Sequence, residues 1–149
     1  MSGARTPKEF AEQYLAALRG ELDHGYLEMW DDDITYRVPG DWPMGGHFKG
    51  KQAYLDSVHK IFGEKYEGAP EPANPIPGAG LYGYEYIVEG NTVVILARSR
   101  ARDSRGMPYT NTFFMWFELN EEGKAIDYMD MADFSSGWQA FFGASLQGK

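Results

Sequence analysis

The stretch Tyr109–Phe134, YTNTFFMWFELNEEGKAIDYMDMADF, decides the fold of this chain. Two strand-like segments, 109–119 and 124–134, flank the turn-forming residues Asn120–Gly123. Two such segments joined by a short polar turn that contains glycine predict an antiparallel β-hairpin. The second segment carries three aspartates and is the most informative part of the hairpin.

Alternation along 124–134 places Asp130 on the same face as Ile126, Tyr128 and Phe134, whereas Asp127 falls on the opposite face. A carboxylate on an apolar face has to be paired, protonated or chemically active, because burying an unpaired charge is costly. Asp130 is therefore the leading candidate for a functional residue. The alternative reading is a structural carboxylate that only bridges neighbouring strands.

The remainder of the chain places helices before strands. A capping box at Thr6-Pro7-Lys8-Glu9 predicts the start of a helix that ends at Gly20. The other predicted elements are a short helix after Asp23, a strand over Ile34–Val38, a return strand at His47-Phe48, a helix over Gly50–Gly63, strands over Leu81–Glu89 and Thr92–Arg102, and a C-terminal helix with Trp138, Phe141 and Phe142. This order indicates a single α+β domain spanning residues 1–149.

Composition excludes several classes of function. The chain of 149 residues has a net charge of −8, which disfavours nucleic-acid binding, and it has no apolar run long enough for a membrane span. It contains no cysteine, so thiol catalysis and thiolate metal sites are excluded, and its three histidines lack the spacing of a metal site. We expect a cytoplasmic protein with no metal and no nucleotide cofactor.

Three segments carry a family resemblance: QYLAALRGELDHGYLEMWDDDITY (Gln13–Tyr36), the motif P-x-x-G-x-x-x-G (Pro43, Gly46, Gly50) and the hairpin at Tyr109–Phe134. Together they resemble the SnoaL-like branch of the nuclear-transport-factor-2-like (NTF2-like) superfamily, which includes ketosteroid isomerases, limonene-epoxide hydrolase and scytalone dehydratase. The resemblance implies a cone-shaped, mostly antiparallel curved sheet wrapped around three N-terminal helices, with a pocket between them.

The resemblance also implies roles for single residues. In SnoaL-like cyclases the middle Asp of the ending acts as acid or base, and that position is Asp130 here. Limonene-epoxide hydrolase uses an Asp-Arg-Asp triad whose other two positions match Arg98 and Arg100, so one Asp of the triad is replaced by Arg. Tyr14 matches the Tyr of ketosteroid isomerase, but both Asp positions of that enzyme hold apolar residues here.

Alternation along Thr92–Arg102 predicts a second part of the candidate site. One face of this segment carries Val94, Leu96, Arg98, Arg100 and Arg102, and we expect it to face inward, so that Arg98 lies beside Asp130 and lowers its pKa. The predicted catalytic residues are thus Asp130 and Arg98. The predicted substrate-binding residues are Tyr14, Tyr36, Trp42, His47, Arg100, Asn111, Phe113, Met115 and Tyr128.

These expectations favour a cofactor-independent acid–base enzyme that acts on a small hydrophobic, oxygenated and cyclic substrate. The rival is a non-catalytic module that binds a small ligand or assembles with a partner. The segment Phe113–Phe117 is apolar on both faces, which predicts that its outer face is covered. The cover is either a second copy of the chain, as the resemblance also implies, or the C-terminal helix.

Overall fold

The computed structural model describes residues 4–39, 46–62, 80–102 and 108–132. In chain order its elements are α1 (Pro7–Leu18), the 3-10 helix η1 (Tyr26–Met29), β1 (Trp30–Val38), β2 (Gly46–Lys49), α2 (Lys51–Phe62), β3 (Gly80–Glu89), β4 (Thr92–Arg102), β5 (Pro108–Leu119) and β6 (Ala125–Ala132). The α+β class is therefore confirmed. Two α-helices and one 3-10 helix stand where three helices were predicted, and the predicted C-terminal helix lies outside the described residues.

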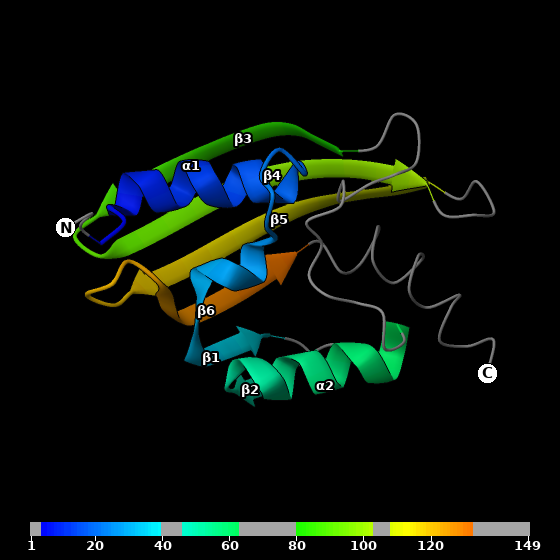
Figure 1. The fold of residues 1–149 in the computed structure, drawn as a ribbon. Helices are drawn as coiled ribbons and strands as arrows, with labels where there is room; N and C mark the ends of the chain where they lie inside the picture. Colours follow the sequence, from blue (N-terminus) through cyan, green and yellow to red (C-terminus); the bar gives the residue numbers. More distant parts are fainter. Residues whose placement is uncertain (1–3, 40–45, 63–79, 103–107, 133–149) are drawn as a thin grey trace.

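The strands form one six-stranded mixed sheet in the order β2-β1-β6-β5-β4-β3. Neighbouring strands are antiparallel except for β1 and β6, which run parallel and bring Tyr36 beside Tyr128. Helix α1 contacts β3 and β4, whereas α2 contacts β1 and β2 (Figure 1). Aromatic contacts of both helices reach the same face of the sheet, which we call the inner face. The opposite face is the outer face.

Helix α1 begins as the sequence predicts. The Thr6 hydroxyl accepts a hydrogen bond of 3.1 Å from the Glu9 amide, and the Glu9 carboxylate accepts one of 3.0 Å from the Thr6 amide. This reciprocal pair satisfies two of the amide donors that a helix start leaves free. No helix in the described part of the chain has the length and apolar character needed to cross a bilayer.

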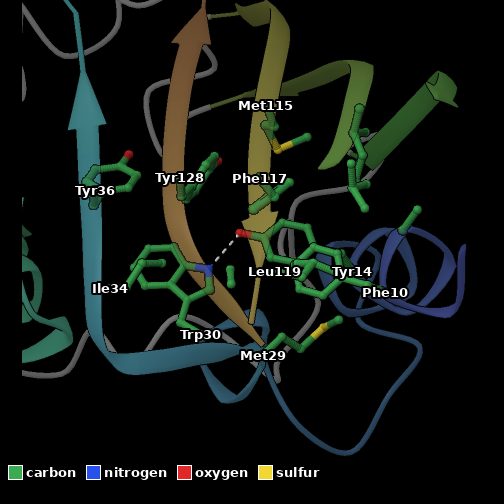
Figure 2. Packing of buried hydrophobic residues seen from close by; sticks show 14 of the residues in the cluster. Phe10, Tyr14, Met29, Trp30, Ile34, Tyr36, Met115, Phe117, Leu119 and Tyr128 are labelled. Atoms are coloured by element: carbon green, nitrogen blue, oxygen red, sulfur yellow. Dashed lines mark hydrogen bonds between the residues drawn. The ribbon is translucent and has the colours of Figure 1, made fainter. Parts of the chain in front are cut away.

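An aromatic core fills the space between the helices and the inner face (Figure 2). Trp30 is 1% exposed, and its indole nitrogen donates a hydrogen bond of 3.2 Å to the Tyr14 hydroxyl. Phe117 stacks on Tyr128 with ring centroids 4.3 Å apart. Burial of such large rings dominates the stability of a domain of this size, and the indole–phenol bond removes the cost of hiding two polar atoms.

The inner face of β4 is the opposite of the predicted one. Val93, Ile95 and Ala97 are each 0% exposed, whereas Arg98 is exposed. The prediction that Val94, Leu96 and Arg98 face inward was therefore wrong. Val93 and Ile95 are apolar on one face of this strand and Val94 and Leu96 on the other, so hydrophobic alternation alone does not tell the two faces apart.

Gly123 lies in the β5–β6 turn at a φ of 74°. A Cβ at this position would collide with the Arg5 carbonyl oxygen and lie 2.8 Å from the Arg5 Cβ. We expect Gly123→Ala to destabilise the fold by roughly 2–4 kcal/mol, since strain at positive φ adds to a backbone clash.

The matched control is Gly90→Ala in the β3–β4 turn, where φ is 58° and nothing lies within 4 Å of an added Cβ. That change should cost only about 1 kcal/mol, from backbone strain alone. Urea unfolding of the three proteins measures both values. Equal losses for the two variants would show that the approach of Arg5 to the turn does not matter.

Candidate active site

The candidate site is centred on Asp130 in β6, the only buried charged residue among those that the structure describes. Its side chain is 8% exposed and lies on the inner face, where the register pairs it with Met115 of β5. The Tyr36 hydroxyl donates a hydrogen bond of 3.3 Å to Oδ2. The other oxygen, Oδ1, is buried without a hydrogen-bond partner among the described residues. The face predicted for Asp130 is thus confirmed.

Buried aromatic rings pack around Tyr36, whose hydroxyl donates to this carboxyl. The Tyr36 ring centroid lies 5.0 Å from that of Tyr128, 5.4 Å from that of Trp30 and 4.9 Å from that of Tyr54. In Figure 2 the hydroxyls of Tyr36 and Tyr128 point toward the C-terminal ends of the two parallel strands that carry them. Two phenols from neighbouring strands therefore converge on the part of the inner face where Asp130 lies.

This environment changes the acidity of Asp130. Burial raises its pKa from 3.8 to about 7, and the hydrogen bonds from Tyr36 and Tyr128 oppose that rise by favouring the ionised form. Burial, together with the negative charge of Asp130, raises the pKa of Tyr128 well above its ordinary value of 10, so this phenol stays protonated. The sequence-based expectation of a lowered pKa for Asp130 was wrong, because burial dominates and Arg98, the expected partner, is exposed on the opposite face.

Arg98 and His47 lie on the side of the sheet that Asp130 does not face. Arg98 is exposed on the outer face and pairs in register with Gly83 and Thr112. His47 is exposed in β2 opposite Arg37, while its neighbour Phe48 packs toward Tyr36 in the core. Neither side chain joins the Asp130 site in this structure.

The other predicted residues divide into two groups. Tyr14, Tyr36, Phe113, Met115 and Tyr128 lie in the core or pack against it, and of these Tyr36, Met115 and Tyr128 adjoin Asp130 directly. Trp42 lies outside the described residues. The side chains of Arg100 and Asn111 are likewise outside the described part, although their backbones belong to β4 and β5.

The sequence did not indicate Tyr36 as the hydrogen-bond donor to Asp130. The sequence predicted Tyr36 only as a residue that lines the site. Alternation over Ile34–Val38 predicts the side of the sheet on which a residue lies, but not which residue of another strand lies next to it. Two more phenols near the site were missed: Tyr54 contacts the Tyr36 ring, and its hydroxyl lies 3.3 Å from that of Tyr26. In the sequence, each of these tyrosines stands on the apolar face of a predicted helix. Such a position predicts packing in the core and does not indicate a place near Asp130.

The described residues hold no group of three or more His, Asp and Glu side chains arranged to bind a metal ion. The chemistry that these side chains can support is proton transfer. An acid with a pKa near 7 is populated in both forms at neutral pH, so it can take up a proton or release one. Oδ1 is the carboxyl oxygen that has no hydrogen-bond partner among the described residues, and it is itself buried.

Tyr36→Phe should raise the pKa of Asp130 further, since the lost hydrogen bond of 3.3 Å favours the ionised carboxylate. We expect a rise of about 0.5–1 pH unit, the size expected when a neutral donor leaves a carboxylate. Carbon-13 NMR of the Asp130 carboxyl measures it, with Tyr54→Phe as the control that keeps the Tyr36 hydroxyl. An unchanged or lowered midpoint in Tyr36→Phe would show that this phenol does not act on the carboxyl.

Comparison with known proteins identifies the fold. No protein-family model matches the sequence, and no curated protein matches it. Among solved structures, TerC co-crystallised with polyporic acid is 21% identical, with a TM-score of 0.63 over 93% of this chain and 99% of that one. A protein described as a SnoaL-like polyketide cyclase from Jannaschia sp. CCS1 is 14% identical, with a TM-score of 0.64 over 94% of each chain.

A third similar structure is described as an NTF2-like protein. An NTF2-like protein of unknown function from Burkholderia pseudomallei K96243 is 20% identical, with a TM-score of 0.58 over 83% of this chain and 88% of that one. Identities at this level establish shared architecture and leave the chemistry open. The chain therefore has the NTF2-like fold, in agreement with the resemblance that its sequence carries.

Proposed function

We propose that this chain is a cofactor-independent acid–base enzyme that moves a proton on a small hydrophobic, oxygenated and cyclic substrate. The observation that carries the proposal is the state of Asp130: a buried carboxyl, with one oxygen unpartnered among the described residues, that titrates near neutral pH between aromatic rings. Perturbed acidity of this kind is concentrated at functional sites.

The mechanism assigns a separate task to each carboxyl oxygen. Tyr36 holds Oδ2, which fixes the orientation of the group, so Oδ1 is the atom that meets the substrate. As a carboxylate, Asp130 removes a proton from a carbon next to a carbonyl group. The acid formed returns that proton to oxygen or to another carbon. The proton balance then closes without a redox partner, which suits isomerisation, cyclisation, dehydration or hydration.

The surroundings favour a substrate that is apolar and ring-shaped. Tyr36, Tyr128 and Trp30 make the surroundings of Asp130 aromatic, and all three are buried in the core. A ring-shaped apolar substrate suits such surroundings, and a phenol hydroxyl would orient its oxygen. Two structural neighbours support this choice: one is described as a polyketide cyclase, and the other was crystallised with polyporic acid. The non-catalytic alternative would use the same surroundings to hold a ligand without changing it.

Ligand binding tests the proposal. Native mass spectrometry of the chain with a panel of cyclic ketones, epoxides and hydroxyquinones should detect one-to-one complexes, and conversion of a bound compound is then followed by chromatography. If Asp130 meets the ligand, affinity for the same compound should differ between pH 6 and pH 8, across the pKa of about 7. Binding of compounds that are never converted at either pH would favour the non-catalytic module.

We also propose that the outer face of the sheet binds a second copy of the chain. Four large apolar residues on this face are well exposed: Ile87 at 69%, Met131 at 44%, Phe114 at 41% and Trp116 at 40%. The register places them in two adjacent rows across β3, β4, β5 and β6. Apart from exposed Glu85 at the β3 end of the second row, these rows form an apolar surface, which is typical of an interface.

A further inference from the structure

The ring of Tyr36 is enclosed by other aromatic rings. Four rings of the described residues contact it: Trp30, Phe48, Tyr54 and Tyr128. The planes of Trp30 and Phe48 lie at 26° and 30° to the Tyr36 plane, whereas those of Tyr54 and Tyr128 meet it edge to face at 66° and 63°. Contacts of both kinds restrict the rotation of a phenol ring in a packed core.

These contacts matter because the hydrogen bond alone orients the phenol weakly. The Tyr36 hydroxyl lies 3.3 Å from Oδ2 of Asp130, beyond the range of about 2.5–3.0 Å that is usual for a hydroxyl donor and an oxygen acceptor. A bond of this length does not fix the direction of a ring by itself. Packing around Tyr36 therefore decides whether its hydroxyl reaches the carboxyl.

Tyr54 is the ring among the four that comes from a helix. The other three stand on strands, namely Trp30 on β1, Phe48 on β2 and Tyr128 on β6. The Tyr54 centroid lies 4.9 Å from that of Tyr36, which is the shortest of the four separations. Tyr54 is 6% exposed, and its centroid also lies 4.9 Å from that of Trp30 and 6.3 Å from that of Phe48. It thus packs against Tyr36 and against the two rings that lie at small angles to it.

Hydrogen bonds hold Tyr54 in this place. Gly50 precedes α2 at a φ of 94°, and its amide donates to the Ile34 carbonyl of β1 at 2.7 Å. One helical turn later, the Tyr54 amide donates to the Gly50 carbonyl at 3.4 Å. At the far end of the side chain, the Tyr54 hydroxyl lies 3.3 Å from that of Tyr26 in η1. Tyr54 is therefore connected through Gly50 to the strand that carries Tyr36, and through its hydroxyl to η1.

We propose that Tyr54 is a positioning residue for Asp130: its ring holds the Tyr36 phenol in the orientation in which the hydroxyl donates to the carboxyl. This role rests on the function proposed above for Asp130 and adds a residue that acts on it from outside the sheet. Tyr54 acts through Tyr36, because the hydrogen bond to Oδ2 comes from Tyr36 and the contact that orients that ring comes from α2.

Removal of the Tyr54 ring tests this role. Tyr54→Leu should raise the pKa of Asp130 by about 0.5–1 pH unit, as is expected for Tyr36→Phe, because the phenol is no longer held where it donates. Tyr54→Phe keeps the ring and should leave the pKa of Asp130 unchanged. Carbon-13 NMR of the Asp130 carboxyl measures the native chain and both variants. An unchanged or lowered midpoint in Tyr54→Leu overturns the role, since water that enters the vacated space would lower the pKa.

The double variant Tyr36→Phe/Tyr54→Leu shows whether the effect passes through Tyr36. Its midpoint should equal that of Tyr36→Phe alone, because the hydroxyl that Tyr54 orients is already absent. A further rise beyond that of Tyr36→Phe overturns the role, since Tyr54 would then act on the carboxyl without Tyr36.

Phe10→Leu is the matched control, because it also removes a buried ring from a helix. Phe10 is 0% exposed, and its described ring contacts are with Tyr14 and Phe117, so the pKa of Asp130 should keep its native value. A rise as large as that in Tyr54→Leu would show a general loosening of the core and overturns the role. Tyr54→Met, whose flexible side chain fills part of the same space, replaces the leucine variant if that variant does not fold.

The native chain separates this role from the proposed function. A native midpoint near 3.8 overturns the function proposed for Asp130 and, with it, the role of Tyr54. A native midpoint of about 7 that Tyr54→Leu does not change overturns the role of Tyr54 alone.

Discussion

Asp130→Asn should be more stable than the native chain at about pH 9 and should lose that advantage at about pH 4. The folded pKa of about 7 lies above the ordinary value of 3.8, so the folded chain binds the proton more tightly than the unfolded chain does. Native stability therefore falls as pH rises from about 4 to about 7 and stays low above that range.

The size of this effect follows from the same difference in pKa. The interval between 3.8 and about 7 corresponds to roughly 4 kcal/mol, an upper estimate for the cost of ionising the buried carboxyl. Asparagine has nearly the same shape and carries no charge, so the variant avoids that cost at alkaline pH. Urea unfolding at a series of pH values, native chain against variant, measures the difference directly.

Asp127→Asn is the control because it makes the same change three residues earlier on the opposite face. Asp127 is about one-third exposed and pairs with Arg37, so its loss should change stability by no more than about 0.5–1 kcal/mol. The free energy of unfolding of Asp130→Asn could instead follow that of the native chain from pH 4 to pH 9. This result would show that ionising the Asp130 carboxyl does not destabilise the folded chain.

The second large effect concerns catalysis. With a substrate found in the ligand screen, Asp130→Asn should lower kcat/KM by about 10²–10⁴-fold, which is the usual contribution of a positioned acid or base. The amide keeps the shape of the side chain but neither takes up nor returns a proton, so binding of the substrate should persist while turnover is lost.

The same pair of aspartates controls this experiment. Asp127→Asn should retain native turnover, since Asp127 lies on the outer face and forms its contact with Arg37. For the native chain, the rate should change through a midpoint near pH 7, and this inflection should vanish from any residual activity of the Asp130 variant. Native turnover by Asp130→Asn would remove this residue from the mechanism.

Local sequence signals predicted those parts of the fold that depend on neighbouring residues. The capping box at Thr6 and Glu9, the β5–β6 hairpin and the inner face of β6 are all confirmed. In each case the information lies within a few residues: a hydroxyl and a carboxylate three apart, a turn with glycine, and an alternation that groups Asp130 with Tyr128 and separates both from Asp127. Asp130 was therefore placed correctly.

The orientation of β4 was not predictable from such signals. Its outer face is apolar over Val94 and Leu96, in addition to the buried Val93 and Ile95, so both phases of the strand look like a core face. Arg98 was then placed inward because the resemblance supplied a catalytic arginine at that position. The exposed apolar outer face is itself the reason for the ambiguity, since a solvated face would have carried polar residues.

The hydrogen-bond donor to Asp130 could not be predicted from the sequence either. Tyr36 and Asp130 lie 94 residues apart, and they meet because β1 and β6 pair in parallel in the middle of the sheet. Alternation reports the face on which each residue lies, but pairing between distant strands depends on the whole topology. The same limit explains why the raised pKa was missed, since burial among distant aromatic rings is its cause.

Titration of the Asp130 carboxyl by carbon-13 NMR, with the signal assigned by its absence in Asp130→Asn, tests the central claim most directly. The burial and the unpartnered Oδ1 predict a midpoint at a pH of about 7. A midpoint near 3.8, the ordinary value of an aspartate, would contradict the account, because such a carboxylate would be ionised and solvated and would have no proton to exchange at neutral pH.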